Sequence, residues 1–212
     1  RELRICVLGG TGFIGSRLVI RLAEQRHWVR VPTRSLAHGA ELRVLPTVEL
    51  IRANIHEPRI LSELFQDIDV VINLVGVLNN PLFGGHGLRS AHVELASKVV
   101  SAARAERVPR LLHMSALGAN AESGPSEYLR TKGEAEKRVI EAGAHLQYTI
   151  FRPSVVFGPG DSLTNRFARL LRLSHGFMPL ARAKARFAPI YVEDVVEAFV
   201  RSLRNHSSVG NT

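Results

Sequence analysis

The 212-residue chain is long enough for one α/β domain with a sizeable core, and its 45% hydrophobic and 22% charged residues are typical of a globular protein. A single cysteine, Cys6, excludes an intramolecular disulfide, and the nine scattered histidines have no metal-ligand spacing, so we expect no metal site. The net charge of +9 comes from basic residues spread along the chain, whereas a nucleic-acid-binding protein more often has a basic stripe interleaved with aromatics.

Short apolar runs alternate with helical patterns through the first three quarters of the chain. In chain order the predicted elements are the strand Leu3–Leu8, the turn Gly9–Gly15, the helix Ser16–Gln25, the strands Trp28–Thr33 and Val48–Ala53, the helix Glu57–Phe65, the strand Val70–Val75, the helix His92–Glu106, the strand Leu111–Met114, a helix capped by Ser126 that ends at Gly143, and the strand Tyr148–Arg152. This alternation predicts an α/β fold: a doubly wound (Rossmann) parallel sheet with helices on both faces.

The pattern is weaker after Gly158. Two helices are predicted there, at Asn165–Leu173 and Glu193–Leu203, with the extended stretch Phe187–Val192 between them. We therefore divide the chain into a Rossmann domain, residues 1–158, and a small C-terminal region, residues 159–212, that packs on the same domain. We expect this C-terminal region to be incomplete.

The first strand leads into a glycine-rich turn that opens a helix. At such a turn, backbone N–H groups and the partial positive charge of the helix N-terminus can hold a pyrophosphate. Gly9 would allow the tight turn, Gly12 the approach of the phosphates, and Gly15 the close packing of the helix. The context of strand, turn and helix favours a dinucleotide site over a turn without a ligand. The residues expected to bind the dinucleotide here are Gly9, Thr11, Gly12, Phe13, Ile14 and Gly15.

The end of the second strand indicates which dinucleotide is bound. A site that prefers NAD usually has an acidic residue there, which holds the ribose 2′-hydroxyl. This strand instead ends in Thr33-Arg34-Ser35, and the guanidinium of Arg34 and the hydroxyl of Ser35 suit a 2′-phosphate. We therefore predict that NADPH (NADP) is preferred over NADH. The alternative is that Arg34 is an ordinary surface-loop residue.

A second group of residues suggests proton-transfer chemistry. Tyr128 and Lys132 lie four residues apart, on one face of a predicted helix, where the lysine cation would lower the pKa of the phenol. Ser115 follows the fifth strand, at the edge of the sheet where ligands bind in such folds. We predict that Tyr128 is a general acid/base, that Lys132 tunes it, and that Ser115 holds the substrate oxygen. An ordinary exposed Tyr–Lys pair is the alternative.

Together these motifs resemble the short-chain dehydrogenase/reductase superfamily, in its extended and atypical branches, over nearly the whole chain. The matching segments are LGGTGFIGS, the fourth-strand NLVG, HMSALG, YLRTK, RPSVVFGPGD and PIYVEDVVEA. Within the superfamily, the combination is most similar to the NADPH-binding accessory subunits of respiratory complex I (NADH:ubiquinone oxidoreductase) and their bacterial relatives. The chain departs from many relatives at Leu8, where they have Thr or Ser, and at Asn54, where an Asp is common.

The resemblance implies further cofactor contacts. Asn54 and Ile55 would flank the adenine, the fourth-strand residues Leu74, Val75 and Gly76 would belong to the cofactor site, and Pro153 to Val155 would lie near the nicotinamide. A C-terminal part would complete the substrate cleft.

Three functions agree with these features. The first is an NADPH-dependent oxidoreductase or epimerase that uses Ser115, Tyr128 and Lys132. The second is a non-catalytic NADPH-binding accessory or assembly protein of NADH:ubiquinone oxidoreductase, whose basic surface docks on an acidic protein or an anionic membrane. A redox-sensing regulator is the third. We expect no nucleic-acid partner and a cytoplasmic location, with peripheral association with the inner membrane as the alternative; the substrate and the oligomeric state stay open.

Overall fold

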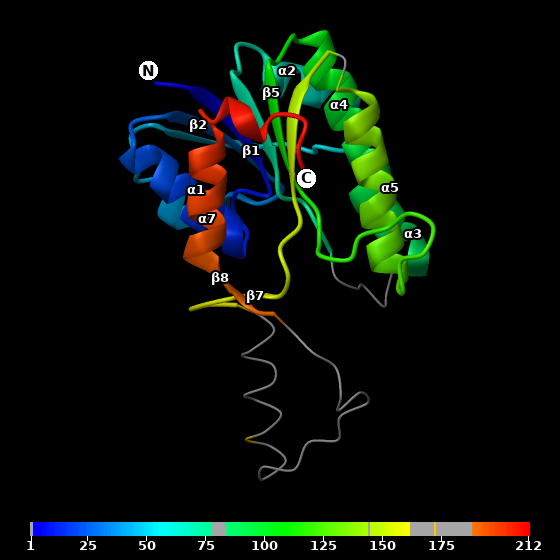
Figure 1. Ribbon diagram of the computed structural model, residues 1–212. Helices are drawn as coiled ribbons and strands as arrows, with labels where there is room; N and C mark the ends of the chain where they lie inside the picture. The colour runs from blue at the N-terminus through cyan, green and yellow to red at the C-terminus, as the bar shows by residue number, and fades with distance from the viewer. Residues whose placement is uncertain (1, 78–83, 144, 162–171, 173–187) are drawn as a thin grey trace.

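The computed structural model describes residues 2–77, 84–143, 145–161, 172 and 188–212. Its centre is a six-stranded, all-parallel sheet in the order β3-β2-β1-β4-β5-β6 (Figure 1). The strands are β1 (Arg4–Leu8), β2 (Trp28–Thr33), β3 (Val48–Arg52), β4 (Val70–Asn73), β5 (Arg110–Met114) and β6 (Gln147–Phe151). The strand order reverses between β1 and β4, as in a doubly wound fold, so the predicted fold class is confirmed.

The sheet is covered on both faces, which explains the continuous apolar runs of its central strands. Along β1, Ile5 and Val7 face one apolar core, and Cys6 and Leu8 face the other. The first core is closed by α1 (Phe13–Glu24) and α7 (Val192–Ser202), which also pack against each other (Figure 1). The second core is closed by α2 (Pro58–Phe65), α4 (Leu95–Ala105) and α5 (Glu127–Glu141).

The predicted helices are present, with shifted boundaries. Ser126 caps α5 as expected, because its Oγ accepts a hydrogen bond from the backbone N–H of Leu129 at 3.2 Å. The first helix begins at Phe13, earlier than the predicted Ser16, with Gly12 as its N-cap. The fourth strand ends at Asn73 instead of Val75, because the Asn73 side chain accepts a hydrogen bond from the Val75 N–H at 3.1 Å and turns the chain.

The prediction that the next helix begins at His92 is wrong. Helical structure starts earlier, with α3 (Gly84–Arg89), and continues through the π-helical turn η2 (Ser90–Glu94) into α4. Three of the six residues of α3 are glycines, whose low helix propensity concealed this helix in the sequence.

The shorter elements include the 3-10 helices η1 (Leu36–Leu42) and η3 (His206–Ser208). A separate two-stranded sheet pairs β7 (Val156–Phe157) with β8 (Ile190–Tyr191). β8 lies within the predicted extended stretch Phe187–Val192. The predicted helix at Glu193–Leu203 is α7. The predicted helix Asn165–Leu173 lies outside the described residues except for residue 172, and the division at residue 158 stays a prediction. Within the described part of the chain, no helix has the length and apolarity needed to cross a membrane.

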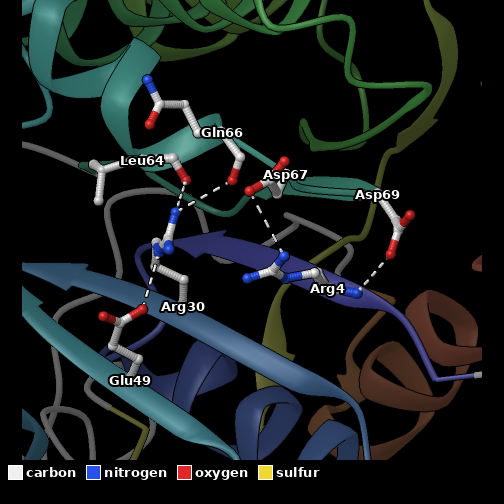
Figure 2. Close-up of polar contacts among 7 residues, drawn as sticks. All are labelled: Arg4, Arg30, Glu49, Leu64, Gln66, Asp67 and Asp69. Carbon is white, nitrogen blue, oxygen red and sulfur yellow. Dashed lines mark hydrogen bonds and ion pairs between the residues drawn. The ribbon is translucent and has the colours of Figure 1, made fainter.

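Arg30 of β2 fastens the C-terminus of α2 to the sheet (Figure 2). Its Nη1 donates to the Leu64 carbonyl oxygen at 2.9 Å, while its Nε donates to the Glu49 carboxylate at 3.1 Å. Because the last carbonyls of a helix carry partial negative charge, the guanidinium stabilises this end of α2. The guanidinium carbons of Arg30 and Arg4 also lie 4.9 and 5.1 Å from the centre of the Trp28 ring.

Candidate functional site

A cleft of about 550 Å³ opens at the carboxyl ends of β1, β2, β3 and β4. It lies where the strand order reverses, which is the usual ligand position in open parallel sheets. Its walls also include residues of η1, α3 and η2. The lining residues are Gly9, Thr11, Gly12, Pro32, Thr33, Arg34, His38, Ala53, Asn54, Ile55, His56, Leu74, Val75, Gly76, Val77, Gly87, Leu88, Ser90 and Ala91.

The turn after β1 requires glycine at two positions. Gly9 has a φ of +80°, which L side chains rarely adopt. At Gly15, a Cβ would lie 2.2 Å from the Gly9 carbonyl oxygen, so only glycine lets α1 pack this closely against the turn. The Gly12 N–H donates to that same oxygen at 3.0 Å. The backbone of this turn therefore needs glycine at both positions, while their part in binding a dinucleotide stays a prediction.

Among the described residues, no side chain caps the N-terminus of α1. Its N-cap, Gly12, has no side chain to bind the free backbone N–H groups, and no acidic residue lies in the first turn. These N–H groups, together with the helix dipole, suit a phosphate. The predicted loop residues Gly9, Thr11 and Gly12 line the cleft. Phe13 lines a neighbouring cavity of about 360 Å³, which shares Thr11 and Gly12, whereas Ile14 and Gly15 are part of neither lining.

The end of β2 gives the cleft a basic rim. Arg34 is exposed, lines the cleft and forms no ion pair with any carboxylate of the described residues. Ser35 is not among the lining residues, but its backbone is held in place: Thr33 Oγ1 donates to the Ser35 carbonyl oxygen at 3.0 Å and accepts from the Ser35 N–H at 3.3 Å. The guanidinium of Arg34 is thus available to a bound anion.

Two histidines that the sequence reasoning missed add to this rim. His38 of η1 and His56, after β3, both line the cleft. Burial, together with the positive charges of Lys98 and Arg34, lowers the pKa of His56. Lys98 of α4 donates to the His56 carbonyl oxygen at 2.9 Å and so ties this segment to α4. No motif marks either histidine; only the folding of η1 and the β3–α2 loop brings them to the cleft.

The family resemblance implies adenine contacts in the segment after β3, and both residues concerned, Asn54 and Ile55, line the cleft. The Asn54 amide nitrogen donates to the Glu57 carboxylate at 2.8 Å, and its oxygen accepts from the His56 N–H at 3.2 Å. Both ends of the amide are therefore engaged within the loop, which holds the loop in a fixed shape beside Ile55.

The wall of the cleft at Gly76 lies next to Lys132, one of the predicted catalytic residues. Leu74, Val75 and Gly76, which the family resemblance implies for the cofactor site, all line the cleft. A Cβ on Gly76 would lie 3.2 Å from Lys132 Nζ, so the ammonium group stands directly behind this part of the wall.

Lys132 joins the ends of two strands. Its Nζ donates to the Val75 carbonyl oxygen after β4 at 3.3 Å and to the Met114 carbonyl oxygen at the end of β5 at 3.1 Å. The side chain is buried, and this burial lowers the pKa of Lys132 to about 8, although the charge of Glu136 raises it in part. The lysine is therefore a buried cation at neutral pH, held by carbonyl oxygens.

Tyr128 lies one helical turn before Lys132 on α5. Its ring packs edge-on against that of His92, with the ring centroids 5.4 Å apart, and its hydroxyl makes no hydrogen bond to any described residue. Burial raises the pKa of Tyr128, so the expectation that Lys132 lowers it is wrong. The cause is that the lysine points to backbone carbonyls, while desolvation disfavours the phenolate. Tyr128 is a neutral phenol at neutral pH.

Ser115 is buried at the carboxyl edge of the sheet. Its Oγ is buried and has no hydrogen-bond partner among the described residues. Its N–H donates to the Phe151 carbonyl oxygen at 2.7 Å, and the Leu117 N–H donates to the Pro153 carbonyl oxygen at 2.8 Å, so the segments after β5 and β6 run side by side. The cleft of 550 Å³ is not lined by Ser115, Tyr128, Lys132, Pro153 or Val155.

His92 connects the cleft wall to α5, and no sequence motif marks this histidine. Its Nε2 accepts a hydrogen bond from the Val77 N–H at 3.2 Å, so Nδ1 carries the proton and donates to Thr131 Oγ1 at 2.9 Å. Burial and the Lys132 charge lower the pKa of His92 to about 3. The ring is therefore neutral and holds the start of the β4–α3 connection against α5.

A second buried pair, Asn73 and His113, lies at the ends of β4 and β5. They are partners in the parallel register, and the Asn73 amide nitrogen lies 3.3 Å from His113 Nδ1. Burial, with the Lys132 charge, lowers the pKa of His113 to about 3. Both residues lie within strands that the sequence predicts, but their pairing depends on the register between those strands, which the sequence does not specify. Around all these side chains, the described residues contain no group of three that could hold a metal ion.

Comparison with protein families gives one match over almost the whole chain: residues 5–212 match the model of the NAD dependent epimerase/dehydratase family. Among solved structures, a UDP-glucuronic acid 4-epimerase from Bacillus cereus, in complex with UDP-glucuronic acid and NAD, is similar with a TM-score of 0.83 and 21% identity. The similarity covers 99% of this chain and 76% of that structure, and it supports the fold.

Two curated proteins illustrate the range of relatives. The chain is 32% identical over 97% of its length to NADH dehydrogenase [ubiquinone] 1 alpha subcomplex subunit 9, mitochondrial, of Arabidopsis thaliana, of which it covers 52%. It is 31% identical over 80% of its length to 2-alkyl-3-oxoalkanoate reductase of Stenotrophomonas maltophilia, of which it covers 56%. The chain thus spans about half the length of these relatives.

Proposed function

Because this chain belongs to the NAD dependent epimerase/dehydratase family, we propose that it binds NADPH at the carboxyl edge of its sheet and acts as an oxidoreductase or epimerase. The observation that carries the proposal is the cleft beside the turn after β1. The N-terminus of α1, which no side chain caps, could bind a phosphate there. Arg34, which has no carboxylate partner among the described residues, also lines the cleft. Gly9, Gly12 and the first turn of α1 would hold the pyrophosphate.

The preference for NADPH rests on charge. A 2′-phosphate at the end of β2 would meet the guanidinium of Arg34, which has no carboxylate partner among the described residues. A free ribose 2′-hydroxyl would find no acidic residue at the end of β2, where Thr33-Arg34-Ser35 stands. Both points favour the phosphorylated dinucleotide.

Bound nicotinamide would supply or accept a hydride, and the chain's own residues would handle the proton. The neutral phenol of Tyr128 is suited to donate a proton to a carbonyl oxygen as that carbonyl is reduced. The Lys132 cation, behind Gly76, would favour negative charge developing nearby. The Ser115 hydroxyl has no hydrogen-bond partner among the described residues, so it could donate a hydrogen bond to a substrate oxygen bound beside it.

A second candidate is an accessory role, in which bound NADPH stabilises the fold and the protein attaches to a larger assembly. The 32% identity to a protein named as a subunit of mitochondrial NADH dehydrogenase favours this role. The net charge of +9 agrees with docking on an acidic protein or an anionic membrane face, and a peripheral association follows from that.

The test is to release, identify and time the nucleotide. Purified protein is denatured, and the released small molecule is identified by absorbance and mass. NADP or NADPH supports the proposal, and its exchange rate against added nucleotide then separates the two roles. Exchange within seconds to minutes favours an enzyme, and retention over hours favours a structural cofactor. A protein that carries no nucleotide and binds none when titrated would contradict both roles.

A further inference from the structure

Glu136 is a buried carboxylate next to the proposed catalytic lysine. It lies on α5 one turn after Lys132, which itself lies one turn after Tyr128, so the three side chains share one stripe of the helix. Only 3% of Glu136 is exposed. Burying a carboxylate is costly unless it is paired and hydrogen-bonded, so this residue must have a partner.

That partner is Arg152, directly after β6. The Arg152 guanidinium binds both carboxylate oxygens of Glu136, with Nε at 2.8 Å and Nη2 at 2.5 Å. This two-point contact fixes the direction of the chain as it enters Pro153. The Pro153 carbonyl oxygen in turn accepts from the Leu117 N–H at 2.8 Å, in the loop that follows Ser115. Glu136 therefore connects the helix of Tyr128 and Lys132 to the loop of Ser115.

The surroundings of Lys132 contain one anion and several neutral groups. Carbonyl oxygens of Val75 and Met114 accept its hydrogen bonds, and the imidazoles of His92 from η2 and His113 from β5 are neutral. Tyr128, on the same helix, is a neutral phenol. Glu136 is the one acidic side chain among the described residues whose charge acts on Lys132.

We propose that Glu136 is a positioning residue of the site: its buried carboxylate stands one helical turn from Lys132 on α5 and, through Arg152, holds the end of β6 against the Ser115 loop. The role assigned to Lys132 rests on the proposed function, but the effect of Glu136 on Lys132 does not require a nucleotide or a substrate.

The test is a direct titration of Lys132 in the full 212-residue chain. The sequence contains four lysines, so protein labelled with ¹³C at the lysine Cε carbons gives a simple NMR spectrum, in which the Lys132 signal is the one lost in Lys132→Met. Its chemical shift is followed from about pH 6 to pH 11. In Glu136→Gln, which keeps the size and hydrogen-bonding shape of the side chain, the Lys132 midpoint should fall below that of the wild type.

Two variants separate charge from packing. Glu134→Gln is the matched control, since Glu134 lies on the same helix but pairs with Arg89 at 2.8 Å, and it should leave the Lys132 midpoint unchanged. Arg152→Lys leaves the Glu136 charge in place and weakens only the two-point contact, so the Lys132 midpoint should not fall. An unchanged midpoint in folded Glu136→Gln, an equal fall in Glu134→Gln, or a fall in Arg152→Lys would overturn the proposal. If Glu136→Gln does not fold, Arg152→Lys tests the other half of the proposal: a weaker two-point contact should loosen the chain at Pro153 and speed amide hydrogen exchange at Leu117, whose N–H donates to the Pro153 carbonyl oxygen. Unchanged exchange at Leu117 would overturn the proposal. Absence of nucleotide binding would instead count against the proposed function alone.

Discussion

Lys132 of α5 donates a hydrogen bond to the carbonyl oxygen of Met114, 3.1 Å away, at the residue directly before Ser115. Its second bond, to Val75, reaches the end of β4 behind Gly76. One side chain thus joins the carboxyl ends of two neighbouring strands to the helix that carries Tyr128. Lys132 therefore holds the backbone of the site in place and also supplies its positive charge.

Arg34→Ala should weaken NADPH binding by about 1–3 kcal/mol, because a charge-assisted hydrogen bond to the 2′-phosphate is lost. NADH binding should hardly change, since NADH lacks that phosphate. Calorimetric titration of the variant with both nucleotides measures the two losses. Equal losses would show that Arg34 does not read the 2′-phosphate.

Tyr128→Phe should lower turnover on any substrate that is found by about 10²–10⁴-fold, the usual contribution of a general acid. The hydroxyl makes no hydrogen bond within the described structure, so NADPH affinity and stability should remain close to those of the wild type. Tyr148→Phe, on β6, is the matched control and should retain full turnover. Unchanged turnover in Tyr128→Phe would remove this residue from the mechanism.

Gly15→Ala and Gly12→Ala should fail in different ways. A Cβ at Gly15 would lie 2.2 Å from the Gly9 carbonyl oxygen, so the fold should lose at least the roughly 1–3 kcal/mol of an overpacked site. At Gly12 the nearest atom would be 3.2 Å away and the backbone is extended, so that variant should fold but bind nucleotide poorly. Thermal unfolding and nucleotide titration of both variants check this. Equal stability of the two would contradict it.

His113 should make the fold sensitive to acid. Its pKa is about 3 in the folded protein and near 6.5 when exposed, so between these values the unfolded chain binds more protons. Stability is therefore complete above about pH 6.5 and falls as the pH drops toward 3. At pH 5 the loss from this residue alone would be about 2 kcal/mol.

The control for this effect is His113→Gln, whose side-chain oxygen can still accept from Asn73. Urea unfolding at pH 7 and pH 5 should show a smaller acid loss in this variant than in the wild type. His92, with a similarly lowered pKa, accounts for part of what remains. An identical acid loss in both proteins would mean that His113 does not titrate in this range.

The fold was predictable because its signals are local. The apolar run of β1, the glycines of the turn and the Ser126 cap each specify their own element without distant contacts. The helix α3 was missed for the same reason, since its glycines oppose the helix locally and only the surrounding structure imposes it.

The site was predictable in part. Residues at strand ends, such as Gly76 and Arg34, follow from the topology, because parallel strands end at one edge. The pKa direction of Tyr128 could not be predicted, since it depends on burial and on where the Lys132 ammonium points. Tertiary packing alone brings His56 to the cleft, and it also brings Glu136 and Arg152 together as an ion pair.

NADPH binding by this protein is tested most directly by a calorimetric titration of the purified chain, freed of bound nucleotide, with NADPH and with NADH under the same conditions. We expect one saturable site that binds NADPH more tightly than NADH, because the proposal places the 2′-phosphate beside Arg34, which has no carboxylate partner in the described part of the chain. Tighter binding of NADH, or no binding of either nucleotide, would contradict the account.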